Sequence, residues 1–222
     1  MNTNNDYKPL SEDLTAQKEA FNAKASEEKK QAYADGLDFV VEQGVLDKAK
    51  NTGDKAPAFT LSNAQGKEVA LNALLEKGPV ILVWYRGGWC PYCNITLHRL
   101  QEELPNFEAH GAQLVALTPE LPDSSLSTAE KHDLSFEVLT DLHNEVAKEY
   151  GVVFGLTPEV AEIYQASFRL HEYNGDESNE LPLAATYVID TDGTITYAFL
   201  DADYRNRAEP SDIIAALEKL EK

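Results

Sequence analysis

Two cysteines, Cys90 and Cys93, stand between an apolar run and a helical pattern, and this arrangement limits the fold more than any other feature of the sequence. Residues 80–85 are almost all apolar, as in a central strand that is buried on both faces of a sheet. After the cysteines, apolar residues recur at helical spacing over residues 91–107. The cysteines therefore lie at a strand-to-helix turn, where unpaired N–H groups and the helix dipole favour thiolate over thiol.

Two other roles for the cysteines fit less well. Free cysteines are often small buried hydrophobes, but here the only two in the chain are three positions apart. A structural zinc site normally needs four ligands, and no two of the five histidines lie three to five residues apart. In a chain in which strands and helices alternate, Cys-x-x-Cys predicts redox chemistry by a thiolate nucleophile.

Composition and charge exclude several classes of partner. The formal net charge of -19 would repel the phosphates of nucleic acid and of anionic membranes. No apolar stretch approaches the roughly 20 residues of a membrane span, and the N-terminus lacks the pattern of a secretory signal. We therefore expect a cytoplasmic protein whose thiols are kept reduced. No glycine-rich phosphate loop is evident, so no bound cofactor is expected.

The chain divides into an N-terminal helical extension, residues 1–50, and an α/β domain, residues 51–222. Apolar spacing predicts two helices within residues 11–43, with Ser26 at the start of the second and Gly44 as its stop. The extension either covers one edge of the domain or forms the contact of a homodimer.

Short strands then alternate with helices, and an antiparallel hairpin with a tight turn at residues 190–193 ends the sheet. The segment 122–133 is expected to be polar with a short helix at its end. This order predicts a mixed sheet with helices on both faces. The expected strands are residues 59–61, 68–71, 80–85, 113–117, 136–139, 186–189 and 195–199, and the other expected helices are 91–107, 144–150, 158–165 and 211–220, the last capped by Ser211.

From residue 53 to its end, the chain resembles the peroxiredoxins and peroxiredoxin-like proteins of the alkyl hydroperoxide reductase/thiol-specific antioxidant family. The resemblance rests on the order and spacing of three segments around the cysteines. They are GDKAPAFTL (53–61), DLHNEVAKEYG (141–151) and ATYVIDTDG (185–193). The resemblance implies a thioredoxin-like fold for residues 51–222.

The family pattern assigns roles to the cysteines and draws attention to two arginines. Peroxiredoxins carry the pattern Pro-x-x-x-Thr-x-x-Cys at this helix start. When the pattern is aligned with this sequence, Cys93 falls at the peroxidatic position. Cys90 falls where threonine is usual, and Arg86 falls near the position of the proline. The arginine that usually holds the thiolate is replaced by Ala184, so Arg86 or Arg207 is expected to take its place.

The resemblance implies a thiol peroxidase that reduces hydrogen peroxide or organic hydroperoxides. The Cys93 thiolate would become a sulfenic acid, and Cys90 would condense with it to a disulfide. A thioredoxin-like protein would then reduce this disulfide by exchange. The preferred peroxide, the physiological reductant and the oligomeric state are left open.

Two alternatives use the same residues. In a thiol-disulfide oxidoreductase acting on protein disulfides, Cys90 would attack and Cys93 would resolve. The active site of thioredoxin, Trp-Cys-Gly-Pro-Cys, differs from WCPYC here, and Ala185 stands where thioredoxins carry a proline. The other alternative is a non-enzymatic redox sensor that binds a partner protein. Glu120 follows a strand end that often lines the site in this fold, and nothing else in the sequence supports a catalytic role for it.

Overall fold

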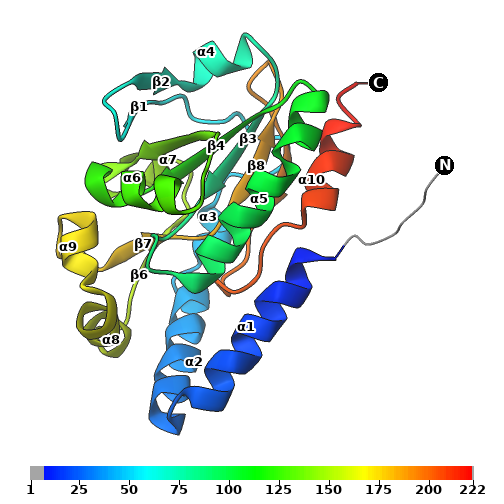
Figure 1. Ribbon diagram of the computed structural model, residues 1–222. Helices are drawn as coiled ribbons and strands as arrows, with labels where there is room; N and C mark the ends of the chain where they lie inside the picture. Colours follow the sequence, from blue (N-terminus) through cyan, green and yellow to red (C-terminus); the bar gives the residue numbers. More distant parts are fainter. Residues whose placement is uncertain (1–7, 222) are drawn as a thin grey trace.

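A seven-stranded mixed sheet forms the centre of the protein in a computed structural model, which describes residues 8–221 (Figure 1). The strand order is β2-β1-β5-β4-β3-β8-β9, in which β3 pairs parallel with β4 and antiparallel with β8. The strands of this sheet are β1 (Thr60–Asn63), β2 (Glu68–Ala70), β3 (Val80–Trp84), β4 (Gln113–Thr118), β5 (Glu137–Thr140), β8 (Thr186–Ile189) and β9 (Ile195–Phe199). A separate antiparallel pair is formed by β6 (Val153–Gly155) and β7 (Glu180–Pro182).

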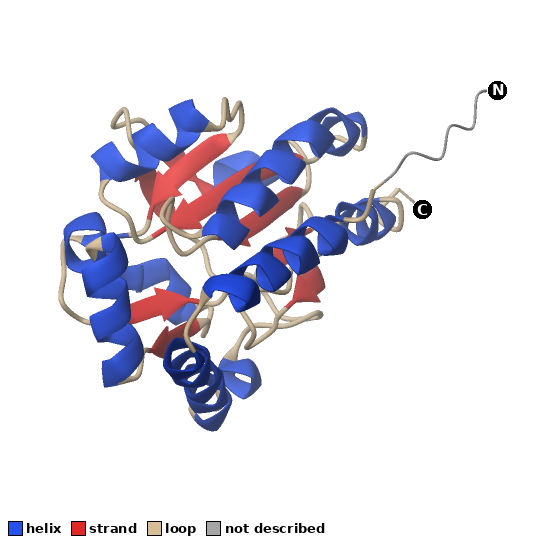
Figure 2. Cartoon of the chain, turned by 60° about the horizontal axis from the view of Figure 1, so that its bottom comes forward, coloured by secondary structure: helices blue, strands red, loops and turns tan. Residues whose placement is uncertain are grey.

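Helices cover both faces of the sheet, as predicted (Figure 2). They are α1 (Leu10–Lys24), α2 (Glu27–Glu42), α3 (Val45–Lys48), α4 (Leu71–Leu75), α5 (Pro91–Ala109), α6 (Pro122–Lys131), the 3₁₀ helix η1 (Leu142–Asn144), α7 (Glu145–Glu149), α8 (Pro158–Phe168), α9 (Leu170–Asn174) and α10 (Pro210–Leu217). None of the helices described combines the length and the hydrophobicity that a bilayer span requires.

Strand β3 separates two hydrophobic cores. Its five residues are each at most 2% exposed, which confirms the prediction of a strand buried on both faces. Because successive side chains of a strand point to opposite faces, Leu82 and Trp84 enter one core, while Ile81 and Val83 enter the other. Helices α1, α5 and α10 close the second core, which also contains both cysteines.

The two predicted helices of the N-terminal extension contribute to both cores. In α1, Leu10 and Leu14 are buried in the core of the cysteines, and the N–H of Leu10 donates to Glu209 at 2.9 Å. In α2, Tyr33 and Val40 are buried in the opposite core. Figure 1 shows α1 and α2 beside the end of the sheet at which α5 begins. The extension is therefore packed around the end of the domain that carries the cysteines.

Several local predictions can be compared with the structure directly. Ser26 caps α2, because its hydroxyl accepts a hydrogen bond from the Lys29 N–H at 3.2 Å. Ser211 as the cap of α10 is wrong: the helix begins at Pro210, whose fixed φ suits the first helical position, and Glu209 precedes it. Likewise α6 begins at Pro122, so helix occupies most of residues 122–133, where only a short helix at the end was expected. The short elements α3, α4, α9, β6 and β7 were not predicted, because three to five residues carry too little periodicity.

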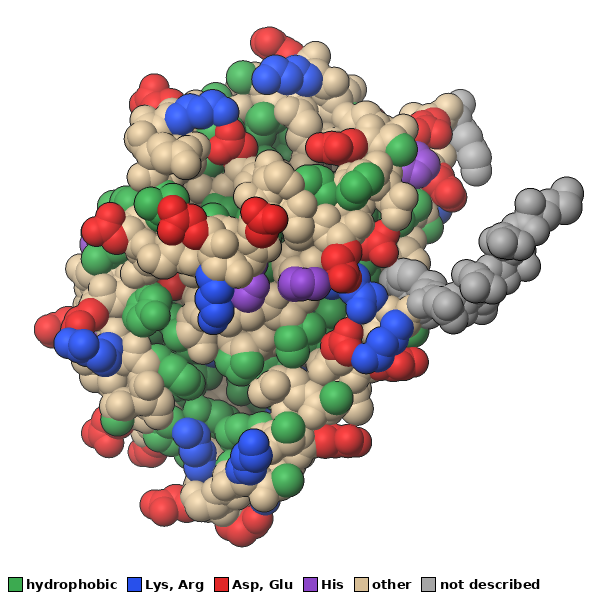
Figure 3. Space-filling model, viewed as in Figure 1, with side chains coloured by type: hydrophobic (Ala, Val, Ile, Leu, Met, Phe, Trp, Pro, Cys, Tyr) green, Lys and Arg blue, Asp and Glu red, His purple; other side chains and the backbone are tan. Residues whose placement is uncertain are grey.

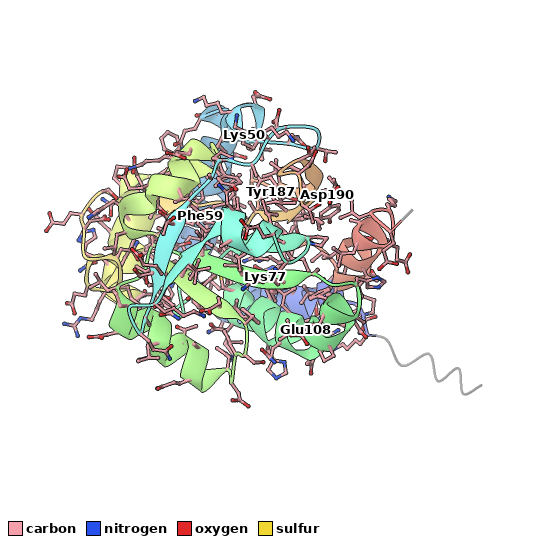
Figure 4. The ribbon with its side chains drawn as sticks, turned by 90° about the horizontal axis from the view of Figure 1, so that it is seen from above. Lys50, Phe59, Lys77, Glu108, Tyr187 and Asp190 are labelled. Atoms are coloured by element: carbon pink, nitrogen blue, oxygen red, sulfur yellow. The ribbon has the colours of Figure 1, made fainter. Side chains whose placement is uncertain are left out.

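Turns lie at the end of the sheet where β3 begins and β8 ends (Figure 4). Lys77 precedes β3 there, and Asp190 follows β8. The hairpin predicted between β8 and β9 is confirmed, and the N–H of Gly193 donates to the carbonyl oxygen of Asp190 at 2.8 Å. Strand β3 therefore runs from these turns towards the cysteines.

Candidate active site

Both cysteines lie at the start of α5, after the turn that follows β3. Cys90 is the N-cap residue with an extended backbone, Pro91 occupies the first helical position, and Cys93 lies in the first turn. The thiols are free, and Cys90 and Cys93 are 1% and 0% exposed. The predicted strand-to-helix turn is therefore present, and it is covered by other parts of the chain.

The pKa values of the two thiols are shifted in opposite directions. Burial raises the pKa of Cys93, but a hydrogen bond from Cys90 and the charges of Arg207 and Arg86 outweigh burial and bring this pKa to about 5. Burial also raises the pKa of Cys90, and the neighbouring Cys93 raises it further, to well above its ordinary value. These shifts favour the thiolate form of Cys93 and the thiol form of Cys90.

Arg207 contacts the sulfur of Cys93. Its Nη2 donates to Sγ at 3.5 Å, from a loop that follows β9. The guanidinium is aimed by backbone carbonyl groups, since Nη1 also donates to the oxygens of Tyr204 and Asn206, the latter at 2.7 Å. The loop itself is held by Arg205, which donates two hydrogen bonds of 2.7 Å to one carboxylate, that of Asp203.

Arg86 lies in a cage of aromatic rings behind the cysteines. It is 2% exposed, and its Nη2 donates to the hydroxyl of Tyr164 at 2.8 Å. The guanidinium carbon lies 3.9 Å from the ring centre of Tyr204 and 5.0 Å from that of Trp89, within the range of cation–π attraction. Among the described residues no carboxylate pairs with this arginine, so its charge acts on the cysteines and tyrosines.

Two glycines allow the tight path from Arg86 to Cys90. Gly87 has a φ of +149°, and a Cβ there would lie 2.2 Å from the indole nitrogen of Trp89. A Cβ on Gly88 would lie 2.1 Å from the hydroxyl of Thr128 in α6. These glycines therefore serve close packing of the turn.

The structure brings together all four residues that the sequence singled out: Cys90, Cys93, Arg86 and Arg207. Sequence reasoning missed Tyr164 and Tyr204 beside Arg86, which come from α8 and from the loop after β9. They carry no local signal, because an aromatic residue at helical spacing is ordinarily part of a core. The sequence also did not predict the burial of Glu120, which is 0% exposed.

A small hollow with a cavity volume of about 20 Å³ lies beside Arg86, between α2 and α8. Figure 3 shows apolar side chains gathered on the lower part of this face, where the surface is hollowed. The lining includes Leu37 and Val40 of α2 and Val160 of α8, together with Tyr204. The extension therefore forms one wall of the space next to the site.

Residues 52–198 match the AhpC/TSA family, which amounts to most of the chain. This chain belongs to the AhpC/TSA family. The match includes the cysteines and Arg86, whereas Arg207 and the helices α1 and α2 lie outside it. Membership confirms the resemblance drawn from the sequence.

Similar proteins include both peroxiredoxins and a thiol-disulfide oxidoreductase. The chain is 27% identical over 168 residues to the chloroplastic peroxiredoxin Q of Sedum lineare, covering 76% of each chain. It is 29% identical over 146 residues to a putative peroxiredoxin of Mycobacterium tuberculosis, covering 66% of this chain and 82% of that one. It is also 29% identical over 118 residues to the thiol-disulfide oxidoreductase ResA of Bacillus cereus, covering 52% and 67%.

Solved structures of peroxiredoxins share the fold of this AhpC/TSA protein. Peroxidoxin BcpB from Mycobacterium tuberculosis matches with a TM-score of 0.61 at 22% identity, covering 77% of this chain and 97% of that one. Peroxiredoxin Q of Xanthomonas campestris matches with a TM-score of 0.58 at 14% identity, covering 78% and 98%. The predicted thioredoxin-like fold is thereby confirmed.

Proposed function

We propose that this AhpC/TSA protein is a thiol peroxidase that reduces hydrogen peroxide or organic hydroperoxides through Cys93 and Cys90. The observation that carries the proposal is the contact of Arg207 with the sulfur of Cys93, at the helix start of a peroxiredoxin-family fold. A buried thiol beside two cations is poised as a thiolate, which is the form that attacks a peroxide.

The first step is attack of the Cys93 thiolate on one oxygen of the hydroperoxide. The O–O bond breaks, the sulfur becomes a sulfenic acid, and the departing alkoxide or hydroxide takes up one proton. Negative charge develops on the departing oxygen, where Arg207, Arg86 and N–H groups at the start of α5 can stabilise it. The two arginines thus take the place of the arginine absent at Ala184.

The second step joins the two cysteines. The Cys90 thiol condenses with the sulfenic acid, which releases water and leaves a Cys90–Cys93 disulfide. A thioredoxin-like dithiol then reduces this disulfide through a mixed disulfide and is itself oxidised. Because both cysteines are almost fully covered, exchange with a protein requires the turn to open.

A coupled assay with thioredoxin, its reductase and NADPH tests the proposal. We expect turnover with hydrogen peroxide or with an organic hydroperoxide, and no turnover in a Cys93→Ser variant. Mass spectrometry of the peroxide-treated protein is expected to show the loss of two hydrogens without cross-linked dimers. Absence of turnover with every peroxide, despite a folded and reduced protein, would overturn the proposal.

Thiol-disulfide exchange with protein substrates is the second candidate function, and the similarity to ResA favours it. In that mechanism Cys90 attacks and Cys93 resolves. Insulin reduction, run beside the peroxidase assay, separates the two functions. The low pKa of Cys93 and the high pKa of Cys90 support the peroxidase assignment.

The finer statements about partners and location are also proposals. A thioredoxin-like protein serves as reductant, and the cytoplasm, where such dithiols keep cysteines reduced, is the proposed location. The extension is proposed as a homodimer contact, which is supported by the exposed apolar side chains of Phe39, Val41 and Leu46 on α2 and α3. Light scattering on the purified protein checks the oligomeric state.

A further inference from the structure

Glu120 is a buried carboxyl group without a cation. It follows β4, is 0% exposed, and accepts a hydrogen bond through Oε1 from the N–H of Gly88 at 2.8 Å. Its other oxygen, Oε2, has no hydrogen-bond partner among the described residues. A carboxylate buried in this way is costly as an anion, and an unpartnered buried oxygen is uncommon in folded proteins.

The carboxyl group is tied to the turn that carries Cys90. While Glu120 holds the N–H of Gly88, the side-chain amide of Asn94 in α5 donates to the carbonyl oxygen of Gly88 at 2.9 Å. Thr128 of α6 leaves no room for a side chain on this glycine. Gly88, two residues before Cys90, is therefore held by contacts with Glu120, Asn94 and Thr128. Of these three side chains, only Glu120 can titrate.

Two titratable groups face Glu120. The hydroxyl of Tyr85, directly after β3, interacts with the carboxyl group, and Cys93 acts from α5. Burial raises the pKa of Glu120 to about 7; the hydrogen bond from Gly88 and the neighbouring Tyr85 lower it, and the negative charge of Cys93 raises it. Among the described residues, no lysine, arginine or histidine contributes to this shift.

We propose that Glu120 is a positioning residue that holds the turn before Cys90 and binds or releases a proton according to the redox state of Cys93. The inference rests on the proposed function, since it concerns the same pair of thiols. The negative charge of a Cys93 thiolate favours the protonated form of Glu120. Once that charge is gone, in the sulfenic acid or the disulfide, the ionised form of Glu120 is favoured instead.

The proton balance of the reaction agrees with this role. When the thiolate attacks the hydroperoxide, the O–O bond breaks and the alkoxide needs one proton, at the same step at which Glu120 releases one. Condensation with Cys90 then joins the two sulfurs and expels water, formed from the thiol proton and the hydroxyl of the sulfenic acid. When an external dithiol reduces the disulfide, Glu120 takes back a proton as the Cys93 thiolate reappears.

Difference infrared spectroscopy tests the proposal on the whole protein, oxidised to the disulfide with diamide at pH 6.5, just below the pKa of about 7. We expect the C=O band of a protonated carboxyl group to be lost on oxidation. In Glu120→Gln, which keeps an oxygen for the Gly88 N–H, this loss is expected to be absent. Glu137→Gln is the matched control, because its carboxylate already pairs with Lys67, and it is expected to behave like the wild type.

A second measurement does not depend on the Gln variant. In Cys93→Ser the thiolate is replaced by a neutral hydroxyl group, so we expect the carboxyl band to titrate at lower pH than in the reduced wild type. An unchanged titration, or a band loss that persists in Glu120→Gln, would overturn the inference.

Diamide oxidises thiols without a peroxide, so the two proposals can fail separately. A band loss on diamide treatment in a protein that reduces no peroxide would overturn the peroxidase and keep the coupling of Glu120 to Cys93. Peroxide turnover without any band loss would keep the peroxidase and overturn the coupling of Glu120 to Cys93.

Discussion

The segment that matches the AhpC/TSA family and the two segments that flank it contribute differently to the site. Residues 52–198 supply the sheet, the helix α5 and both cysteines. The flanking segments supply Arg207, which contacts the Cys93 sulfur, Tyr204 against Arg86, and the buried residues of α1 and α2. The matched segment thus supplies both cysteines and Arg86, and the flanks supply the cation that contacts the Cys93 sulfur.

The difference shows how a family can keep a nucleophile while changing what surrounds it. Where the family usually has an arginine, this chain has Ala184, which is buried at 5% exposure. A cation reaches the sulfur from the loop after β9 instead, 114 residues along the chain from Cys93. The requirement that persists is a positive charge next to the thiolate, since burial alone would keep the thiol neutral.

The largest effect is expected in the core. Cys93→Ser removes the attacking thiolate, so reaction with peroxide should be abolished, whereas Cys90→Ser should leave the first attack intact and accumulate a sulfenic acid on Cys93. Labelling with a dimedone probe, followed by peptide mass spectrometry, checks this. Labelling of Cys90 in Cys93→Ser, with none of Cys93 in Cys90→Ser, would reverse the two assignments.

The next largest effect is expected from the flanking loop. Arg207→Gln removes a charge that lowers the pKa of Cys93, so this pKa should rise from about 5 and the reaction with peroxide at pH 6 should slow by about 100-fold. Stopped-flow rates between pH 4 and 9 measure both changes.

Arg169→Gln is the matched control for this prediction, because that side chain is 71% exposed and pairs only with Glu172 among the described residues. It should leave the pH profile unchanged. An unchanged profile in Arg207→Gln as well would mean that the flanks do not set the charge environment of the thiolate.

A smaller effect, on stability, tests whether the extension belongs to the core. Leu10 of α1 is fully buried with the residues around the cysteines, so Leu10→Ala should lower the free energy of unfolding by about 2–5 kcal/mol. Leu46→Ala in α3, where the side chain is 37% exposed, should cost less than about 1 kcal/mol. Urea denaturation compares them, and equal small losses would show that the extension packs only loosely on the matched segment.

The smallest effect is expected in the pH dependence of stability. The pKa of Glu120 rises on folding from its ordinary value of 4.5 to about 7, so its contribution is fully present below pH 4.5 and is lost as the pH rises through 7. The pKa of Cys93 falls on folding, so its contribution has the opposite sign and grows from about pH 5 upwards. The two contributions partly cancel in the wild type.

Replacing Glu120 removes one of these contributions. The free energy of unfolding of Glu120→Gln minus that of the wild type should therefore grow by up to about 3 kcal/mol between pH 4.5 and 7. Urea denaturation at several pH values measures it. A constant difference would show that Glu120 ionises in the folded protein as readily as in water.

The sequence by itself determined the features that a few neighbouring residues control. An apolar run, a Cys-Pro-x-Cys turn and helical spacing specify β3 and the start of α5, Ser26 specifies the cap of α2, and residues 190–193 specify the hairpin turn. The family resemblance added the thioredoxin-like fold. Each of these depends on local backbone preferences or on patterns within one segment, which a reader of the sequence can see.

Only the tertiary structure decided the surroundings of the thiols. The sequence left open whether Arg86 or Arg207 approaches Cys93, and folding places both charges near it, with the guanidinium of Arg207 donating a hydrogen bond to the sulfur. The aromatic cage of Arg86 and the burial of Glu120 likewise come from segments far apart in the chain. The reason is physical: a pKa depends on burial and on charges a few ångströms away, and those distances exist only once the elements are packed.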